Sequence, residues 1–301
     1  MKSYYLCTAK IGTFDDYIPE KRRPEQKWFY LTHGSLSLKN TKGKLDIPPF
    51  VDYILFPSEN VSKALSNIYN IEYPSKRALF LGMPVDDIFY SDKEHGHLHK
   101  LTNKKYRKTI IWLPTFRKKI DSDRNDSDNQ QIFGLPLISN YQDIINLNNI
   151  LQSQNILLII KYHPMQDMNS IKHLNDLSNV IVVNNKVMIE KKIDLYHLLK
   201  DTDALITDYS SVSADYMHMN KPTAYTRDDI NIYNLGIVED FDHLFVGDIL
   251  ISFDDLIKFI NNVNNEIDAF QDERNKAKDF IFKYSDGNAS KRLIDFIENI
   301  L

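Results

Sequence analysis

Hydroxyl, imidazole and cationic side chains follow four apolar runs in this sequence. They occur in Thr32-His33-Gly34, in Pro114-Thr115-Phe116-Arg117, in Lys161-Tyr162-His163-Pro164 and in Thr207-Asp208-Tyr209-Ser210-Ser211. Arginine and lysine bind phosphate oxygens through their charge, and serine hydroxyls at a helix start can join backbone N–H groups in binding an anion. Histidine titrates near neutral pH and suits a general base. Together the four segments indicate chemistry at a phosphate group of a nucleotide-linked substrate.

The serine segment is the most informative of the four. An apolar run over 204–206 predicts a buried strand, and helical spacing starts at Val212, so Ser210 and Ser211 are expected where the helix begins. Asp208 in the same turn can orient a hydroxyl or cap the turn. Taken alone, each segment also fits an ordinary structural role, such as a capped helix, a core histidine or a solvated basic turn.

Short apolar runs alternate with helical patterns along most of the chain. Continuous Ile, Leu and Val strands separated by helices are typical of parallel sheets with helices on both faces, so we predict an α/β fold. The polar segment 91–108 is expected to link two lobes. The predicted strands are 4–8, 27–32, 51–57, 77–81, 109–113, 156–161, 180–183, 204–207 and 222–225, and the predicted helices are 59–69, 138–153, 194–200 and most of the tail 252–301.

The four polar segments all follow predicted strands. Ligands of open α/β sheets bind beyond the carboxyl ends of the strands. We therefore expect the four segments to converge on one crevice.

The composition excludes several classes of protein. The chain has 301 residues, a formal net charge of −4, one cysteine (Cys7) and nine glycines. The charge gives no signature of nucleic-acid binding, the single cysteine excludes an internal disulfide, and the glycine-rich phosphate motifs are absent. Because the sequence has no signal-peptide pattern and no run of 18 apolar residues, we expect a cytoplasmic protein without a transmembrane helix. A His-x-His-x-His run over 95–99 lies in the charged linker, so neither a metal site nor a cofactor is predicted.

Six short motifs, taken in order, resemble the CDP-glycerol glycerophosphotransferase family, which includes teichoic-acid primases and polymerases and related capsule enzymes. The ordered set covers nearly the whole chain, from about residue 20 to residue 295. The motifs are Gln26-Lys27 leading to His33-Gly34, Gly82-Met83-Pro84 with Asp86-Asp87, Pro114 to Arg117, Lys161 to Pro164, Thr207 to Ser211 with Asp215 and Lys221-Pro222, and Asp286 to Ser290 with Arg292.

The resemblance implies a GT-B-like fold, in which two Rossmann-like lobes flank the active site. It implies transfer of glycerol phosphate, or another alditol phosphate, from a donor such as CDP-glycerol to an acceptor hydroxyl, with release of CMP. The catalytic candidates are His33, as the general base, and His163. The candidates for substrate binding are Gly34, Thr115, Arg117, Lys161, Thr207, Asp208, Ser210 and Ser211.

The expected domains are an acceptor-side lobe over 1–100, a nucleotide-donor lobe over 101–285 and a C-terminal helix over 286–301. Besides the short candidate 4–8, three strands are predicted before the linker, so the first lobe is short: either further sequence lies upstream, or a partner covers its open sheet edge. The resemblance also implies a lipid-linked or glycan acceptor and peripheral contact with the inner face of the cell membrane. The basic clusters 21–23 and 104–108 could meet anionic lipid there, or could be ordinary solvated loops.

Two other functions fit the same residues. A GT-B glycosyltransferase with a nucleotide-sugar donor would keep the fold and form a glycosidic bond, whereas the predicted enzyme forms a phosphodiester. A non-catalytic member would bind a nucleotide or a partner enzyme without releasing CMP.

Overall fold

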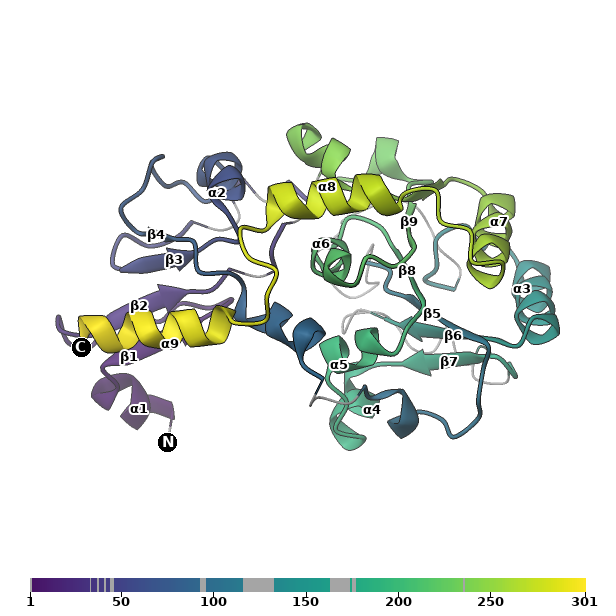
Figure 1. The fold of residues 1–301 in the computed structure, drawn as a ribbon, viewed down its shortest axis with the longest axis horizontal. Helices are drawn as coiled ribbons and strands as arrows, with labels where there is room; N and C mark the ends of the chain where they lie inside the picture. Colours follow the sequence, from purple (N-terminus) through teal and green to yellow (C-terminus); the bar gives the residue numbers. More distant parts are fainter. Residues whose placement is uncertain are drawn as a thin grey trace.

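A computed structural model describes residues 2–32, 34–36, 38–40, 42–43, 46–92, 96–115, 133–162, 174, 177–234 and 236–301. Two parallel sheets lie side by side, one in each half of the chain (Figure 1). The first sheet has the order β1-β2-β3-β4 and the second the order β10-β9-β8-β5-β6-β7. Every strand pair of both sheets is parallel, which confirms the predicted α/β class.

The strands of the first sheet are β1 (Ile11–Phe14), β2 (Lys27–Tyr30), β3 (Tyr53–Leu55) and β4 (Ala78–Leu79). Those of the second sheet are β5 (Lys108–Trp112), β6 (Ile156–Lys161), β7 (Val180–Val183), β8 (Ala204–Thr207), β9 (Thr223–Thr226) and β10 (Asp248–Leu250). The α-helices are α1 (Lys2–Thr8), α2 (Glu59–Ser66), α3 (Tyr141–Ser153), α4 (Asn185–Glu190), α5 (Leu195–Lys200), α6 (Val212–Tyr216), α7 (Phe253–Asn264), α8 (Gln271–Ile281) and α9 (Ala289–Ile300). Short 3-10 helices are η1 (Pro84–Tyr90), η2 (Leu98–Lys100), η4 (Met217–Met219), η5 (Ile230–Ile232) and η6 (Glu239–Leu244).

The second sheet has the strand order of a doubly wound Rossmann-type fold. Its first strand in the chain, β5, lies in the middle; β6 and β7 follow on one side, and β8, β9 and β10 on the other. The direction of winding therefore reverses between β5 and β8. In such sheets this reversal opens a crevice at the carboxyl ends of the two strands, and ligands bind there.

Continuous apolar strands are needed because both faces of the second sheet are buried. Along β5, Ile110 and Trp112 pack into one hydrophobic core, while Ile111 packs into the other. Successive side chains of a strand point to opposite faces, so a strand buried on both sides cannot alternate with polar residues.

A hydrophobic core also joins the two lobes. It contains Tyr30 and Ile54 from the first sheet together with Tyr209, Phe245 and Ile281 from the second half of the chain. Helix α8 runs between the lobes, and α9 then returns along the first lobe (Figure 1). The ring of Phe296 in α9 lies 5.1 Å from that of Tyr53 and 6.2 Å from that of Phe29.

Three details of the predicted fold need correction. Residues 4–8, predicted as a strand, lie in helix α1. A run of only five residues does not distinguish a strand from a helix, and Tyr4 is 68% exposed. Strands β1 and β10 and helix α4 were not predicted, because the two strands contain too few consecutive apolar residues and α4 shows no extended helical spacing. With β1 the described first sheet has four strands, against six in the second.

No helix among the described residues has the length and apolar content needed to cross a membrane.

Candidate active site

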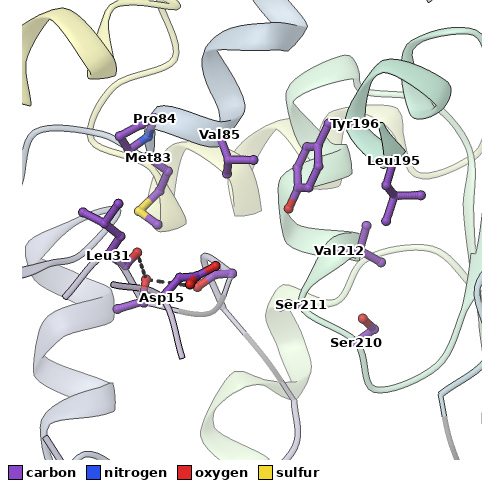
Figure 2. Close-up of a pocket in the computed structure, with 12 residues that line it drawn as sticks. Asp15, Leu31, Met83, Pro84, Val85, Leu195, Tyr196, Ser210, Ser211 and Val212 are labelled. Atoms are coloured by element: carbon purple, nitrogen blue, oxygen red, sulfur yellow. Dashed lines mark hydrogen bonds between the residues drawn. The ribbon is translucent and has the colours of Figure 1, made fainter. Parts of the chain in front are cut away.

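A cleft of about 410 Å³ lies between the two lobes (Figure 2). The first lobe contributes Asp15, Leu31, Thr32 and Gly34 and the 83–85 segment at the start of η1. The second lobe contributes Leu195 and Tyr196 from α5, and Ser210, Ser211 and Val212 from the turn after β8. Two of the four predicted segments therefore meet here, as expected from their positions after strands.

Gly34 and Ser211 are in direct contact across the cleft. The backbone of Gly34 has a φ of +87°, and a Cβ built on it would lie 2.2 Å from Ser211 Oγ and 2.6 Å from Ser211 Cβ. Only glycine fits both the left-handed backbone and this close approach. Thr32, two residues before Gly34, also has a positive φ of 59°, and its hydroxyl lies 2.7 Å from the Leu31 carbonyl oxygen.

The turns after β5 and β8 are held together at the reversal point of the second sheet. The backbone N–H and the hydroxyl of Thr115 both donate to Asp208 Oδ2, each at 2.9 Å. The Asp208 Oδ1 atom accepts from the backbone N–H of Tyr209 at 2.7 Å, and the Thr207 hydroxyl donates to the Leu113 carbonyl at 2.9 Å. Thr207 and Asp208 are fully buried. Their side chains therefore shape the turn, and Ser210 and Ser211 rather than these two line the cleft.

Ser210 and Ser211 line the cleft. Ser211 precedes α6, and its side chain makes no capping hydrogen bond to that helix. The Ser210 carbonyl accepts from the Ser213 hydroxyl at 2.9 Å, which fixes the turn without using the Ser210 side chain. The helical spacing expected from Val212 to Met219 is divided between α6 and η4.

Lys161 ends β6, the strand beside β5. Burial lowers the pKa of its ammonium group. No hydrogen bond or ion pair of Lys161 Nζ is found within the described part of the chain. A partly buried cation is stabilised by any anion that comes within reach, so Lys161 suits a phosphate.

With this geometry in place, comparison with known proteins identifies the family. The model of the CDP-glycerol:poly(glycerophosphate) glycerophosphotransferase family matches residues 5–299. The chain belongs to this family.

Several members of the family are similar to this chain. A teichoic acid glycerol-phosphate primase of Bacillus subtilis (strain 168) is 27% identical over 99% of this chain and 76% of its own length. A teichoic acid ribitol-phosphate primase of Bacillus spizizenii is 23% identical over 99% of this chain and 77% of its own length. The structure of the wall teichoic acid polymerase TagF superposes with a TM-score of 0.69 at 19% identity, covering 96% of this chain and 72% of that one. This likeness confirms the GT-B-like fold.

Two further family motifs fasten α9 to the first lobe. The carboxylate oxygens of Asp87 accept from the backbone N–H groups of Ala289 and Ser290 at 2.8 and 2.7 Å. Arg292 donates two hydrogen bonds to Asp286, at 2.8 and 2.9 Å, and a third to the Leu81 carbonyl at 2.7 Å. The motifs at 82–87 and 286–292 therefore have a structural role in this member of the glycerophosphotransferase family.

Three predicted site residues lie outside the described part of the structure. They are His33, Arg117 and His163. His33 adjoins Thr32 and Gly34 of the cleft in sequence, and His163 follows Tyr162 at the end of β6. The roles expected of these three side chains stay predictions.

The histidine run in the linker has a structural role where it is described. His95 lies outside the described residues, whereas His97 Nδ1 accepts from the Asp194 backbone N–H at 2.9 Å. The His97 ring stacks on that of His197, with centroids 4.4 Å apart. Within the described residues, no group of three potential ligands could hold a metal ion.

The sequence-based prediction missed four polar residues beside the cleft: Asp86, Tyr196, Asp215 and His218. Tyr196 lines the cleft, and its hydroxyl donates to Asp215 Oδ2 at 2.5 Å. Asp86 and Asp215 occur within family motifs, so the sequence contained a signal for them. Their role depends on a contact that the sequence does not show, because both carboxyl groups accept hydrogen bonds from Ser35.

Proposed function

We propose that this protein transfers glycerol phosphate, or another alditol phosphate, from a CDP-linked donor to an acceptor hydroxyl during synthesis of a teichoic-acid or capsule-type polymer. Membership of the glycerophosphotransferase family supports this proposal. The observation that carries it is the contact of Gly34 with Ser211 in a cleft at the reversal point of the donor-type sheet. This is where a Rossmann-type lobe binds a nucleotide.

In the proposed reaction, the acceptor oxygen attacks the phosphorus that carries the alditol. A new P–O bond forms, the P–O bond to CMP breaks, and the acceptor proton passes to His33. Ser210, Ser211 and Lys161, with Arg117 and His163, bind the diphosphate of the donor and stabilise the charge that develops on it. Such preorganised stabilisation of developing charge is usually the largest part of catalysis.

We propose that residues 1–100 form the acceptor-side lobe, residues 101–285 the donor lobe, and residues 286–301 a helix that packs back on the first. We also infer a lipid-linked or glycan acceptor at the inner face of the cell membrane, with peripheral contact. Part of the basic surface is neutralised, because Lys21 pairs with Asp52 at 2.6 Å and Lys108 with Glu266 at 2.9 Å. The acceptor, rather than these clusters, would then draw the protein to the membrane, which flotation with and without acceptor-bearing vesicles would test.

The first experiment measures CMP release from CDP-glycerol and from CDP-ribitol, with and without a lipid-linked or glycan acceptor. Acceptor-dependent CMP release with one donor, together with a phosphodiester product, is the expected result. A glycosidic product from a nucleotide sugar would contradict the proposal. Donor binding without CMP release under any acceptor condition would favour a binding protein.

A second experiment tests whether His33 is the general base. His33→Ala is expected to lower transfer by about 10²–10⁴-fold, the usual contribution of a general base, while donor affinity changes by no more than about threefold. His99→Ala, at an exposed position in the linker, is the matched control and should be unchanged. Normal turnover by the His33 variant would show that another group accepts the proton.

A further inference from the structure

Two buried carboxyl groups, one from each lobe, meet behind the cleft. Asp86 lies on η1 and is 4% exposed; Asp215 lies on α6 and is fully buried. Between them is Ser35, also fully buried, which directly follows Gly34. Two carboxyl groups so close together in a protein interior need a physical explanation, because burial of an unpaired charge is costly.

Ser35 is held by both carboxyl groups at once. Its backbone N–H donates to Asp215 Oδ1 at 3.3 Å, and its hydroxyl donates to Asp86 Oδ2 at a longer 3.5 Å. The peptide after Gly34 is thus attached to the second lobe through Asp215 and to the first lobe through Asp86. Because Gly34 packs against Ser211, this attachment also sets the distance between the two walls of the cleft.

The outer partners of the two carboxyl groups differ. Both oxygens of Asp215 accept hydrogen bonds, one from Ser35 and one from the Tyr196 hydroxyl at 2.5 Å. Asp86 Oδ2 lies 3.1 Å from His218 Nε2, and the other nitrogen of His218 lies 2.7 Å from the Tyr90 hydroxyl. Asp86 Oδ1 is buried and has no hydrogen-bond partner among the described residues. Two accepted hydrogen bonds suit a carboxylate at Asp215, whereas the poorly satisfied Asp86 suits a neutral acid.

The electrostatics agree with this assignment above about pH 7, where Asp215 is ionised. Burial raises the pKa of Asp86 well above its usual range. Burial is the main cause that raises the pKa of Asp215 to about 7, and burial lowers the pKa of His218 to about 4. The contact between Asp86 and His218 is therefore a hydrogen bond between neutral groups. The other titratable groups that act on the cluster are Asp87, Tyr90, Asp194, Tyr196 and Lys278.

We propose that Asp215, as a carboxylate, and Asp86, as a neutral acid, are positioning residues that clamp Ser35 and thereby hold Gly34 and Tyr196 in the cleft for transfer. This inference rests on the proposed function, but the clamp itself has consequences that can be measured without any substrate. Neither residue lines the cleft. Asn at position 86 reproduces a neutral acid, whereas no neutral residue reproduces the carboxylate at position 215.

The first arm of the test needs no substrate. Between the unfolded pKa of an aspartate, about 4, and the folded value near 7, the folded state binds one more proton at Asp215, so the protein loses stability as pH rises. Below pH 6.5, the lowered pKa of His218 makes the protein more stable as pH rises, which opposes the effect of Asp215. The comparison of wild type with Asp215→Asn removes this contribution, because His218 is present in both proteins. From pH 5 to 7, the unfolding equilibrium constant of the wild type should increase relative to that of the variant by up to about tenfold per pH unit.

The second arm measures transfer. Asp86→Asn should keep kcat within about threefold, whereas Asp215→Ala should lower kcat by about tenfold or more with the donor KM changed by less than about threefold. Tyr196→Phe removes a hydrogen-bond donor to Asp215 and keeps the aromatic ring. It should also lower kcat, and it replaces Asp215→Ala in the test if that variant does not fold. The matched control is Asp248→Asn on the edge strand β10, where burial also raises the pKa of the carboxyl. It should leave kcat unchanged.

The two arms distinguish failure of the proposed transferase function from failure of the carboxyl clamp on Ser35. If the wild type releases no CMP from any CDP-alditol, the proposed function fails, and the first arm alone decides on the clamp. A carboxyl group buried in the clamp must bind its proton more tightly than it does in the unfolded chain. If the stability difference between wild type and Asp215→Asn does not vary with pH, Asp215 is not buried as the clamp requires, and the clamp is overturned whatever the activity. Equal loss of kcat in Asp86→Asn and Asp215→Ala would overturn the assignment of the neutral acid to Asp86.

Discussion

At the scale of the residue, Gly34 decides whether the two lobes can approach. It combines a left-handed backbone with a contact that leaves no room for a Cβ beside Ser211. Gly43 has a similar φ of +75°, but a Cβ there would meet no described atom within 4 Å. Alanine substitutions at Gly34 and Gly43 can therefore be compared. The difference between them separates the free-energy cost of a left-handed alanine backbone from the cost of crowding against Ser211.

Gly34→Ala is expected to destabilise the protein by about 2–5 kcal/mol, the sum of about 1–2 kcal/mol for a left-handed alanine and about 1–3 kcal/mol for overpacking. Gly43→Ala, the matched control, should lose only the first contribution. Unfolding in urea gives both values. Adding Ser211→Gly to the Gly34 variant should recover the overpacking share, and a double variant no more stable than the single one would contradict the contact.

Thr115 provides a second prediction at this scale. Thr115→Val keeps the shape of the side chain but removes the hydroxyl that donates to the buried Asp208, a change that should cost about 1.5–3 kcal/mol. Thr115→Ser retains the hydroxyl and should retain most of the stability. Denaturant unfolding of the two variants tests this, and equal losses would show that the hydroxyl is not what holds the turn.

At the scale of the element, the second sheet places the candidate site and α9 completes the first lobe. The reversal of winding between β5 and β8 brings Thr115 and Asp208 into contact, although their segments are far apart in the sequence. Helix α9 covers part of the first sheet, with Leu293 and Ala289 buried along it. Its N-terminus is held by the carboxylate of Asp87, which accepts from two of the N–H groups that a helix start leaves unpaired.

Asp87→Ala should therefore destabilise the protein by about 1–2 kcal/mol, the upper part of the range for loss of a helix cap. Asp92→Ala, at an exposed position shortly after η1, is the matched control and should stay within about 0.5 kcal/mol of the wild type. Urea unfolding followed by circular dichroism measures both. A loss no larger than that of the control would show that α9 docks through its apolar face alone.

At the scale of the whole molecule, the two lobes are joined by a shared hydrophobic core and the cleft lies between them. The lobes are joined by that core, by the buried carboxyl pair and by α8 and α9. A ligand that bridges the cleft adds contacts on both sides. Its binding should therefore stabilise the molecule as a unit.

CDP-glycerol at 100 times its dissociation constant is expected to raise the free energy of unfolding by about 2.7 kcal/mol, because a ligand that binds only the folded state stabilises it by mass action. At the same ligand concentration, Ser210→Ala with Ser211→Ala should show a smaller rise, since two donors to the diphosphate are removed. Thermal unfolding followed by the fluorescence of the buried Trp28 and Trp112 measures both. A larger effect of a UDP-sugar than of CDP-glycerol would favour a nucleotide-sugar donor.

The strands that could be predicted from sequence are those with long apolar runs. The runs over 27–32 and 156–161 became β2 and β6, because a strand buried on both faces needs apolar residues throughout. The run over 4–8 was too short to distinguish helix from strand, and β1 and β10 show too few apolar residues to be recognised. Their assignment depends on neighbours that supply hydrogen bonds, and those neighbours are distant in the sequence.

The sequence by itself determined the family, the α/β class and the candidates Gly34, Lys161, Ser210 and Ser211, because these follow from local residue types placed after apolar strands. Only the tertiary structure decided that Thr207 and Asp208 are buried in the turn while the two serines line the cleft. It also decided that Asp86 and Asp215 meet at Ser35. Residue type says which groups can donate, accept or ionise, but burial and the approach of two lobes set which of them face the substrate and which of them hold a proton.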